Sequence, residues 1–236
     1  MSLLSAYQAL LLLILVLILP VLAVLNSAAT ARILNAKPEL RWAFYQQGMI
    51  FQWLLVVLIG LALWWQGEEW SAIGLQPILR TEFWLSFVAL VLLARLVYRW
   101  YRPGTGVIRW IQALYQHVAH YLPVDQRSFN WGVPMALTAG LCEEMIFRGY
   151  LYHQLLNWVP IWLAVLLVNV VFAVTHYATG LLNVLGAFAL GLLFSGLYLW
   201  TGDLWLSMWL HALIDLLAMT LYPLANQPAE KSRQTT

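Results

Sequence analysis

Apart from Arg95, which lies within one turn of the end of its run, six residues capable of acid, base or ion-pair chemistry lie within long apolar stretches of the sequence, where such side chains are rare. They are Glu143, Glu144, Arg148, His176, His211 and Asp215. A charged side chain near the centre of a bilayer costs roughly 2.5–3.5 kcal/mol, so it persists only if it is paired or faces water. A carboxylate grouped with imidazoles can activate a water molecule and stabilise an oxyanion. These residue types therefore predict a hydrolytic site within a membrane.

Helical spacing assigns different roles to the two adjacent glutamates. Glu144 and Arg148 are four residues apart with the acid first, which is the favourable order for an ion pair on one helix face. We therefore predict that this pair is structural. Glu143 lies about 100° further round the helix. It has no such partner on its own helix, which leaves it free to act as a general base.

Two other stretches supply the remaining polar groups. Asn169, Phe172 and His176 are spaced so that one stripe of a helix presents all three. His211 and Asp215 are four residues apart and share one face of a further helix. These groups can meet Glu143 only if a helical bundle is built around them.

The composition indicates what kind of protein must position this group. Of the 236 residues, 63% are hydrophobic and only 9% are charged, whereas soluble domains carry about 25% charged residues. The net charge of +2 and the lack of a Lys/Arg-rich run argue against nucleic-acid binding. The single cysteine, Cys142, excludes an intramolecular disulfide and a Cys-based metal site. We therefore predict a polytopic membrane protein and exclude a soluble enzyme.

The predicted fold class is all-α, a polytopic helical bundle of about seven transmembrane helices, each needing roughly 20 apolar residues. The assigned runs are 5–25, 42–65, 83–98, 131–152, 158–177, 181–200 and 204–222. Apolar residues recur at helical spacing over 107–122, which predicts one amphipathic helix on the membrane surface. No Lys or Arg precedes the first run, so we expect a retained helix and not a signal peptide.

Loop charges predict the orientation of the bundle. Lys and Arg concentrate in the 26–41 and 99–130 segments and in the tail, which places these segments in the cytoplasm and the N-terminus outside a cell (plasma) membrane. We divide the chain into three parts. Residues 1–130 hold N-terminal membrane helices and the surface helix, residues 131–222 the catalytic membrane core, and residues 223–236 a polar cytoplasmic tail.

Three motifs occur in order on three of the last four predicted spans. EExxxR runs from Glu143 to Arg148, FxxxH from Phe172 to His176, and HxxxN/D from His211 to Asp215. In motif order and spacing the chain resembles the CAAX protease and bacteriocin-processing (CPBP, or Abi) family of intramembrane proteases. The resemblance covers about residues 128–222. The earlier spans match only as generic membrane helices.

The resemblance implies an intramembrane endopeptidase that hydrolyses a peptide bond in a membrane-associated or lipidated substrate. Carried over by motif, Glu143 and His176 would activate the attacking water, and His211 and Asp215 would hold the oxyanion or help position groups around it. Family members often have Asn at the last position. Because an ionised Asp cannot donate a hydrogen bond, Asp215 would instead orient His211 or complete a metal site. Expected partners are a membrane-associated peptide or protein and the lipid bilayer, with no nucleic acid.

The sequence leaves the metal question open. Glu143, His176 and His211 are acceptable zinc ligands, which would make the protein a metalloprotease, but no HExxH motif is present. A metal-free glutamate-type mechanism remains the alternative.

Depth sets a condition on the site, because Glu143 lies roughly 18 Å into its predicted span and His176 near the end of the next. Their depths agree only if the span 131–152 starts nearer Ala136 or the next span passes Tyr177.

Other readings of the same residues remain. Chains of Glu, His and Asp also relay protons in transporters, and a non-catalytic immunity or scaffold protein could use the same fold. Cys142 and Ser195 are potential nucleophiles. However, a lone buried cysteine is usually an apolar filler, and serine beside glycine, like Gly186, Gly191 and Gly196 themselves, usually serves helix packing.

Overall fold

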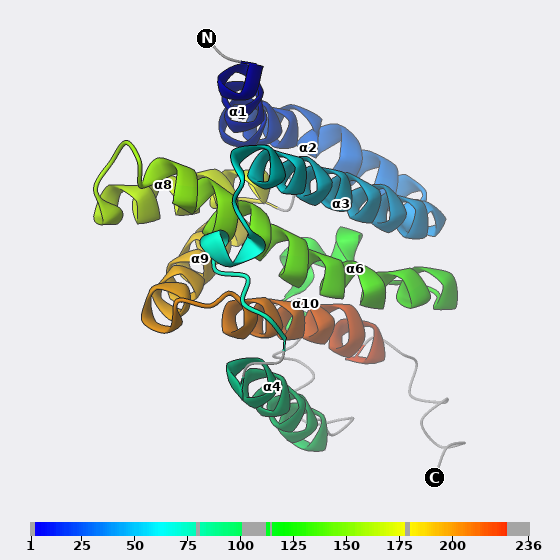
Figure 1. The fold of residues 1–236 in the computed structure, drawn as a ribbon. Helices are drawn as coiled ribbons and strands as arrows, with labels where there is room; N and C mark the ends of the chain where they lie inside the picture. The colour runs from blue at the N-terminus through cyan, green and yellow to red at the C-terminus, as the bar shows by residue number, and fades with distance from the viewer. Residues whose placement is uncertain (1–2, 79–80, 101–111, 114, 178–179, 226–236) are drawn as a thin grey trace.

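A computed structural model describes residues 3–78, 81–100, 112–113, 115–177 and 180–225, and the secondary structure in these ranges is entirely helical (Figure 1). The predicted all-α fold class is confirmed. Each of the seven predicted runs coincides with a helical segment over the residues described.

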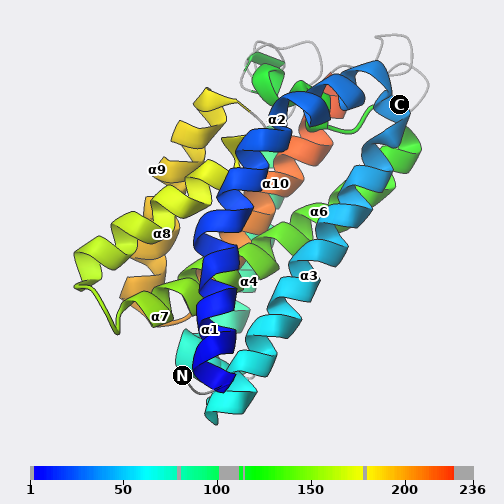
Figure 2. The ribbon, with the colours of Figure 1, turned by 90° about the horizontal axis from the view of Figure 1, so that it is seen from above.

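The chain begins with two long antiparallel helical segments (Figure 2). The first comprises α1 (Leu3–Leu13), a π-helical turn (Ile14–Ile18) and α2 (Leu19–Ala36). A short 3-10 turn (Pro38–Leu40) leads into α3 (Arg41–Gln66), which ends at Gly67 in the left-handed conformation. The Tyr7 hydroxyl donates to the Leu58 carbonyl at 2.7 Å and ties α1 to α3.

A 3-10 turn (Trp70–Ile73) and α4 (Thr81–Trp100) follow. The predicted amphipathic helix over 107–122 falls largely outside the described residues. Its last part, Gln116–Tyr121, is a 3-10 helix with Val118 and Tyr121 buried. The Tyr121 carbonyl accepts a hydrogen bond from Tyr45, so this end of the segment is fixed against α3.

The segment with the EExxxR motif is one continuous helical run. It comprises α6 (Gln126–Glu144), the π-helix η5 (Met145–Leu151) and α7 (Tyr152–Leu155). Asp125 caps its start by accepting from the Ser128 amide, while the Ser128 hydroxyl accepts from the Asp125 amide. This reciprocal capping box satisfies donors that the first helical turn leaves free.

Three helices complete the described bundle. They are α8 (Ile161–Thr175), α9 (Leu181–Thr201) and α10 (Trp205–Ala225). In Figure 1, α6 lies between α3 and α10, and α8 packs beside α9. Gly140 permits the approach of α6 to α10, because a Cβ atom there would lie 2.5 Å from the Ala212 backbone nitrogen.

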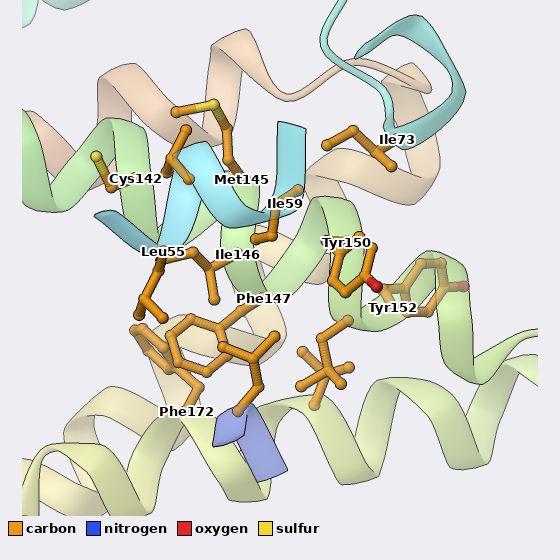
Figure 3. Packing of buried hydrophobic residues seen from close by; sticks show 14 of the residues in the cluster. Leu55, Ile59, Ile73, Cys142, Met145, Ile146, Phe147, Tyr150, Tyr152 and Phe172 are labelled. Atoms are coloured by element: carbon orange, nitrogen blue, oxygen red, sulfur yellow. The ribbon is translucent and has the colours of Figure 1, made fainter. Parts of the chain in front are cut away.

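The apolar core lies where α3, the π-helix η5 and α8 meet. Leu55 and Ile59 of α3 pack near Ile146 and Phe147 of η5, and Phe172 of α8 completes this group (Figure 3). The Phe147 and Phe172 rings meet edge to face with centroids 5.2 Å apart. This core fixes η5 directly beside the charged cluster.

Four helical segments are long and apolar enough to cross a membrane by length and composition. They are Leu3–Ala36, Pro38–Gln66, Leu181–Thr201 and Trp205–Pro223. The apolar stretches Phe83–Val97 and Ile161–Thr175 are shorter. Trp64, Trp158 and Trp200 are more than three quarters exposed near helix ends, as in an interfacial aromatic belt. The protein is therefore a membrane protein.

Candidate active site

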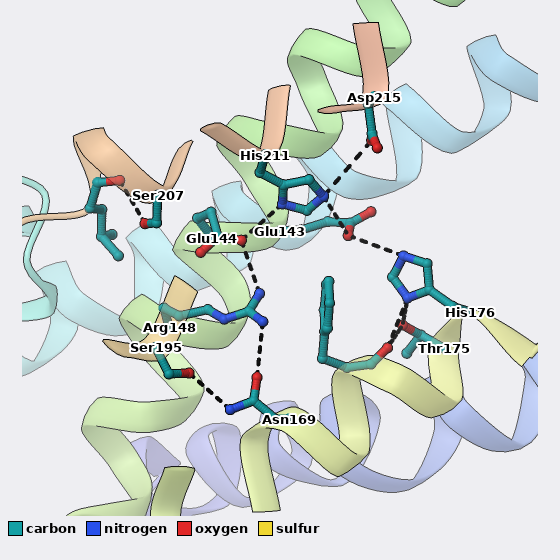
Figure 4. A network of polar contacts seen from close by, with 12 residues as sticks. Glu143, Glu144, Arg148, Asn169, Thr175, His176, Ser195, Ser207, His211 and Asp215 are labelled. Atoms are coloured by element: carbon teal, nitrogen blue, oxygen red, sulfur yellow. Dashed lines mark hydrogen bonds and ion pairs between the residues drawn. The ribbon is translucent and has the colours of Figure 1, made fainter. Parts of the chain in front are cut away.

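The structure brings the four predicted catalytic residues together from three segments (Figure 4). Glu143 Oε2 lies 3.8 Å from His176 Nε2 and 4.0 Å from His211 Nε2. On the other side, His211 Nε2 lies 3.8 Å from Asp215 Oδ2. These separations exceed hydrogen-bond length. The four side chains therefore lie close together without direct hydrogen bonds across these separations.

The depths of Glu143 and His176 agree for a reason that the sequence analysis did not foresee. The helix carrying Glu143 starts earlier than predicted, at Gln126, and α8 ends at Thr175, so both proposed adjustments are wrong. Glu143 lies 12 residues before Leu155, the end of α7, and His176 lies 15 residues after Ile161, the start of α8. The two side chains meet because both are positioned from the turn between α7 and α8.

Glu144 has two partners. Its Oε1 atom accepts from Arg148 Nη1 at 2.9 Å, which confirms the predicted ion pair, and both side chains are buried. The same oxygen lies 2.9 Å from His211 Nδ1. Because an ionised carboxylate only accepts hydrogen bonds, His211 carries a proton on Nδ1. Glu144 therefore orients His211, a role that the sequence analysis gave to Asp215.

His176 is oriented by its own helix. It follows the last residue of α8, and its Nδ1 lies 2.9 Å from the Phe172 carbonyl oxygen. Because a carbonyl cannot donate, Nδ1 carries a proton, and in the neutral ring Nε2 presents a lone pair. Nε2 is the ring nitrogen that faces Glu143.

The predicted supporting residues form a second tier around Arg148. Arg148 Nη2 donates to Asn169 Oδ1 at 3.0 Å, and Asn169 Nδ2 donates to Ser195 Oγ at 2.9 Å. The guanidinium carbon lies 4.1 Å from the centre of the Phe172 ring. Ser195 thus serves this network, in keeping with the packing role predicted for it.

Local backbone features make room for this tier. Arg148 lies in the π-helix η5, a rare form that often occurs at functional sites. A Cβ atom at Gly191 would lie 2.3 Å from Asn169 Oδ1 and 2.8 Å from Arg148 Nη2. Gly191 therefore has the predicted packing role. Gly186 and Gly196 do not, because a Cβ atom at either would meet nothing within 4 Å.

Gln52 of α3 is not among the site residues predicted from the sequence. Its Nε2 donates to Glu143 Oε1 at 2.8 Å, which gives the general-base candidate a partner on another helix. The available signal was an amide in the middle of the apolar run 42–65.

Two cavities meet at the site. One, of about 500 Å³, lies mainly among α2, α3 and α6 and is lined by Glu143, Gln52 and apolar side chains. The other, of about 650 Å³, is lined largely by α9, α10 and residues 113–122, and it includes His211. His176 and Asp215 line both cavities. The candidate catalytic groups therefore stand at the boundary between two spaces.

The predicted metal ligands were tested against this geometry. Across the described ranges, the structure contains no group of three or more His, Cys, Asp or Glu side chains arranged to hold a metal ion. Glu143 Oε2 is buried without a hydrogen-bond partner, yet it and the two imidazoles are not in ligand positions as they stand. Zinc binding at this site stays a prediction.

The fold and site define a helical membrane bundle with an internal Glu/His centre. Residues 125–217 match the family model described as type II CAAX prenyl endopeptidase Rce1-like. This match includes all three motifs and confirms the resemblance predicted from the sequence. No match to the chain was found among curated proteins or among solved structures.

Proposed function

We propose that this protein is an intramembrane endopeptidase that hydrolyses a peptide bond in a membrane-associated, lipidated substrate of the CAAX prenyl type. The observation that carries the proposal is the position of Glu143. Its Oε2 faces two imidazoles at the boundary of two cavities. Each cavity can hold the substrate chain on one side of the cleaved bond.

The proposed reaction uses one water molecule between Glu143 Oε2 and His176 Nε2. The water donates one hydrogen to each, and Glu143 takes a proton as the water oxygen attacks the carbonyl carbon. The carbonyl electron pair moves onto its oxygen, toward His211 Nε2, which in the imidazolium form donates to the oxyanion. When the C–N bond breaks, Glu143 returns its proton to the leaving amine.

The substrate class is supported by the cavity between α2 and α3. Its wall is mostly apolar and includes Leu19, Phe44 and Phe51, with Glu143 at one side. Such a space suits an apolar chain attached near the cleaved bond.

We also propose, from loop charges, that the protein lies in the plasma membrane with the N-terminus outside and the C-terminus in the cytoplasm.

The test is cleavage of a prenylated CAAX peptide by purified protein in lipid nanodiscs. We expect Glu143→Gln and His176→Ala to lower turnover by about 100- to 10,000-fold, since each removes a group that moves or holds a proton. Glu69→Gln and His153→Ala, which lie outside the site, should retain the wild-type rate.

Equal cleavage by wild type and both site variants would contradict the protease proposal and leave the transporter and non-catalytic hypotheses. A chelation series on the same assay tests zinc. Undiminished turnover after metal removal argues against a zinc requirement, whereas loss that added zinc restores supports one.

A further inference from the structure

Gln52 contacts the candidate general base from outside the family match. It lies on α3, far from residues 125–217 in sequence, yet its amide nitrogen is 2.8 Å from Glu143 Oε1. The other carboxylate oxygen, Oε2, is the atom that faces His176 and His211. The amide therefore holds one oxygen and leaves the other directed at the reaction centre.

The chemistry of the pair determines how the amide is turned. An ionised carboxylate oxygen can only accept, so the nitrogen of Gln52 and not its oxygen must face it. Gln52 Oε1 is buried and, over the described residues, has no hydrogen-bond partner. A buried unpaired acceptor is costly. An unpaired amide oxygen in the otherwise apolar stretch Met49–Leu63 is what a functional and not a stabilising role would leave.

The surroundings make Gln52 a rigid support. Leu55, Val56 and Ile59, one and two turns further along α3, are buried in the core. The terminal torsion of a glutamate side chain is broad. Without an anchor, the Glu143 carboxylate would sample orientations in which Oε2 no longer faces His176.

We propose that Gln52 is a positioning residue for Glu143 in the hydrolytic reaction. This inference rests on the proposed protease function. Its hydrogen bond is to the Glu143 carboxylate, and Gln52 acts through that group.

The test compares Gln52→Met with Gln47→Met, a matched change at an exposed glutamine of the same helix. Methionine keeps the length of glutamine and removes the donor. We expect Gln52→Met to lower kcat by about 10- to 100-fold, the usual effect of losing a hydrogen bond to a charged group, with KM within about twofold of wild type. Gln52→His, which restores an N–H donor at similar reach, should recover part of kcat. Gln47→Met should match wild type.

An independent readout is the infrared carboxyl band of Glu143, identified by its absence in Glu143→Gln. This band should shift in Gln52→Met and not in Gln47→Met, whether or not the peptide is a substrate. An unchanged band, or wild-type kcat in Gln52→Met, overturns the positioning role, as does a rise in KM alone. If the wild type does not cleave the peptide but the band still shifts in Gln52→Met, this result counts against the proposed function and not against the Gln52–Glu143 contact.

Discussion

Glu144 is shared between a structural and a reactive neighbour, because Arg148 and His211 both meet the same oxygen. The two glutamates of the motif therefore have different roles because their side chains point in different directions. Glu143 points into the cavity between α2, α3 and α6, whereas Glu144 points into the bundle and has no exposed surface. Loss of Glu144 would strand Arg148, a buried cation, and release His211.

The two glutamates should therefore differ in their effect on stability. We expect Glu144→Gln to lower the free energy of unfolding by about 3 kcal/mol or more, because breaking a buried ion pair leaves its partner uncompensated. Glu143→Gln should change it by less than about 1 kcal/mol. Chemical unfolding of both variants in the same micelle provides the measurement. Equal stabilities of the two variants would contradict the structural role assigned to Glu144.

The sequence predicted much of the site at the residue level, and its omissions have a physical cause. Intrahelical spacing identified the Glu144–Arg148 pair, and motif order identified the groups that meet Glu143. Spacing within one helix cannot tell which residue on another helix completes a hydrogen bond. The contacts of Gln52 with Glu143 and of Glu144 with His211 therefore required the packed structure.

At the scale of elements, the approach of α6 to α10 at Ala212 depends on the absence of a side chain at Gly140. A Cβ atom there would lie 2.5–2.7 Å from Ala212 backbone and side-chain atoms. Backbone cannot move aside as a flexible side chain can. Because α10 carries His211 and α6 carries Glu143, this crossing also sets the distance between them.

Gly140→Ala should consequently destabilise the protein by about 1–3 kcal/mol, the usual effect of overpacking. Gly196→Ala is the matched control, since Gly196 is an exposed helical glycine with open space around it. It should be neutral or stabilising by up to about 1 kcal/mol through helix propensity. Thermal unfolding of the two variants checks the difference, and identical melting temperatures would refute it.

The start of α6 carries a pH-dependent cap. Hydrogen bonding from the Ser128 amide holds the pKa of Asp125 below its ordinary value of 3.8. Its charge therefore stabilises the folded state fully above that ordinary value, and this contribution is lost as the pH falls through the lowered pKa.

Asp125→Asn should isolate this effect, because asparagine also caps helices but does not ionise. Wild type should exceed the variant by a few tenths of a kcal/mol near neutral pH, and the difference should vanish in acid. Unfolding curves from pH 7 to about pH 3 provide the measurement. A difference that stays constant over this range would exclude the Asp125 charge as its source.

At the scale of the whole molecule, apolar runs predicted where the helices lie but not how they are arranged. All seven runs coincide with helices where the chain is described. The helix boundaries differ from the predicted ones where local hydrogen bonds set them, as at the start of α6, which follows the capping box of Asp125. The order of α3, α6 and α10 depends on complementary surfaces, such as Gly140 against Ala212, which periodicity does not encode. The division into three parts at residues 130 and 222 stays a prediction.

The cavity beside Glu143 has a consequence for the modularity of the protein. Its walls come partly from α2 and α3, through Leu19, Phe44 and Gln52, and partly from the segment 125–217 that matches the family model. The matched segment therefore carries the similarity to the family, but it does not enclose the cavity by itself. A transplanted copy of residues 125–217 would carry the motifs but lack a wall of its chamber and the anchor of its carboxylate.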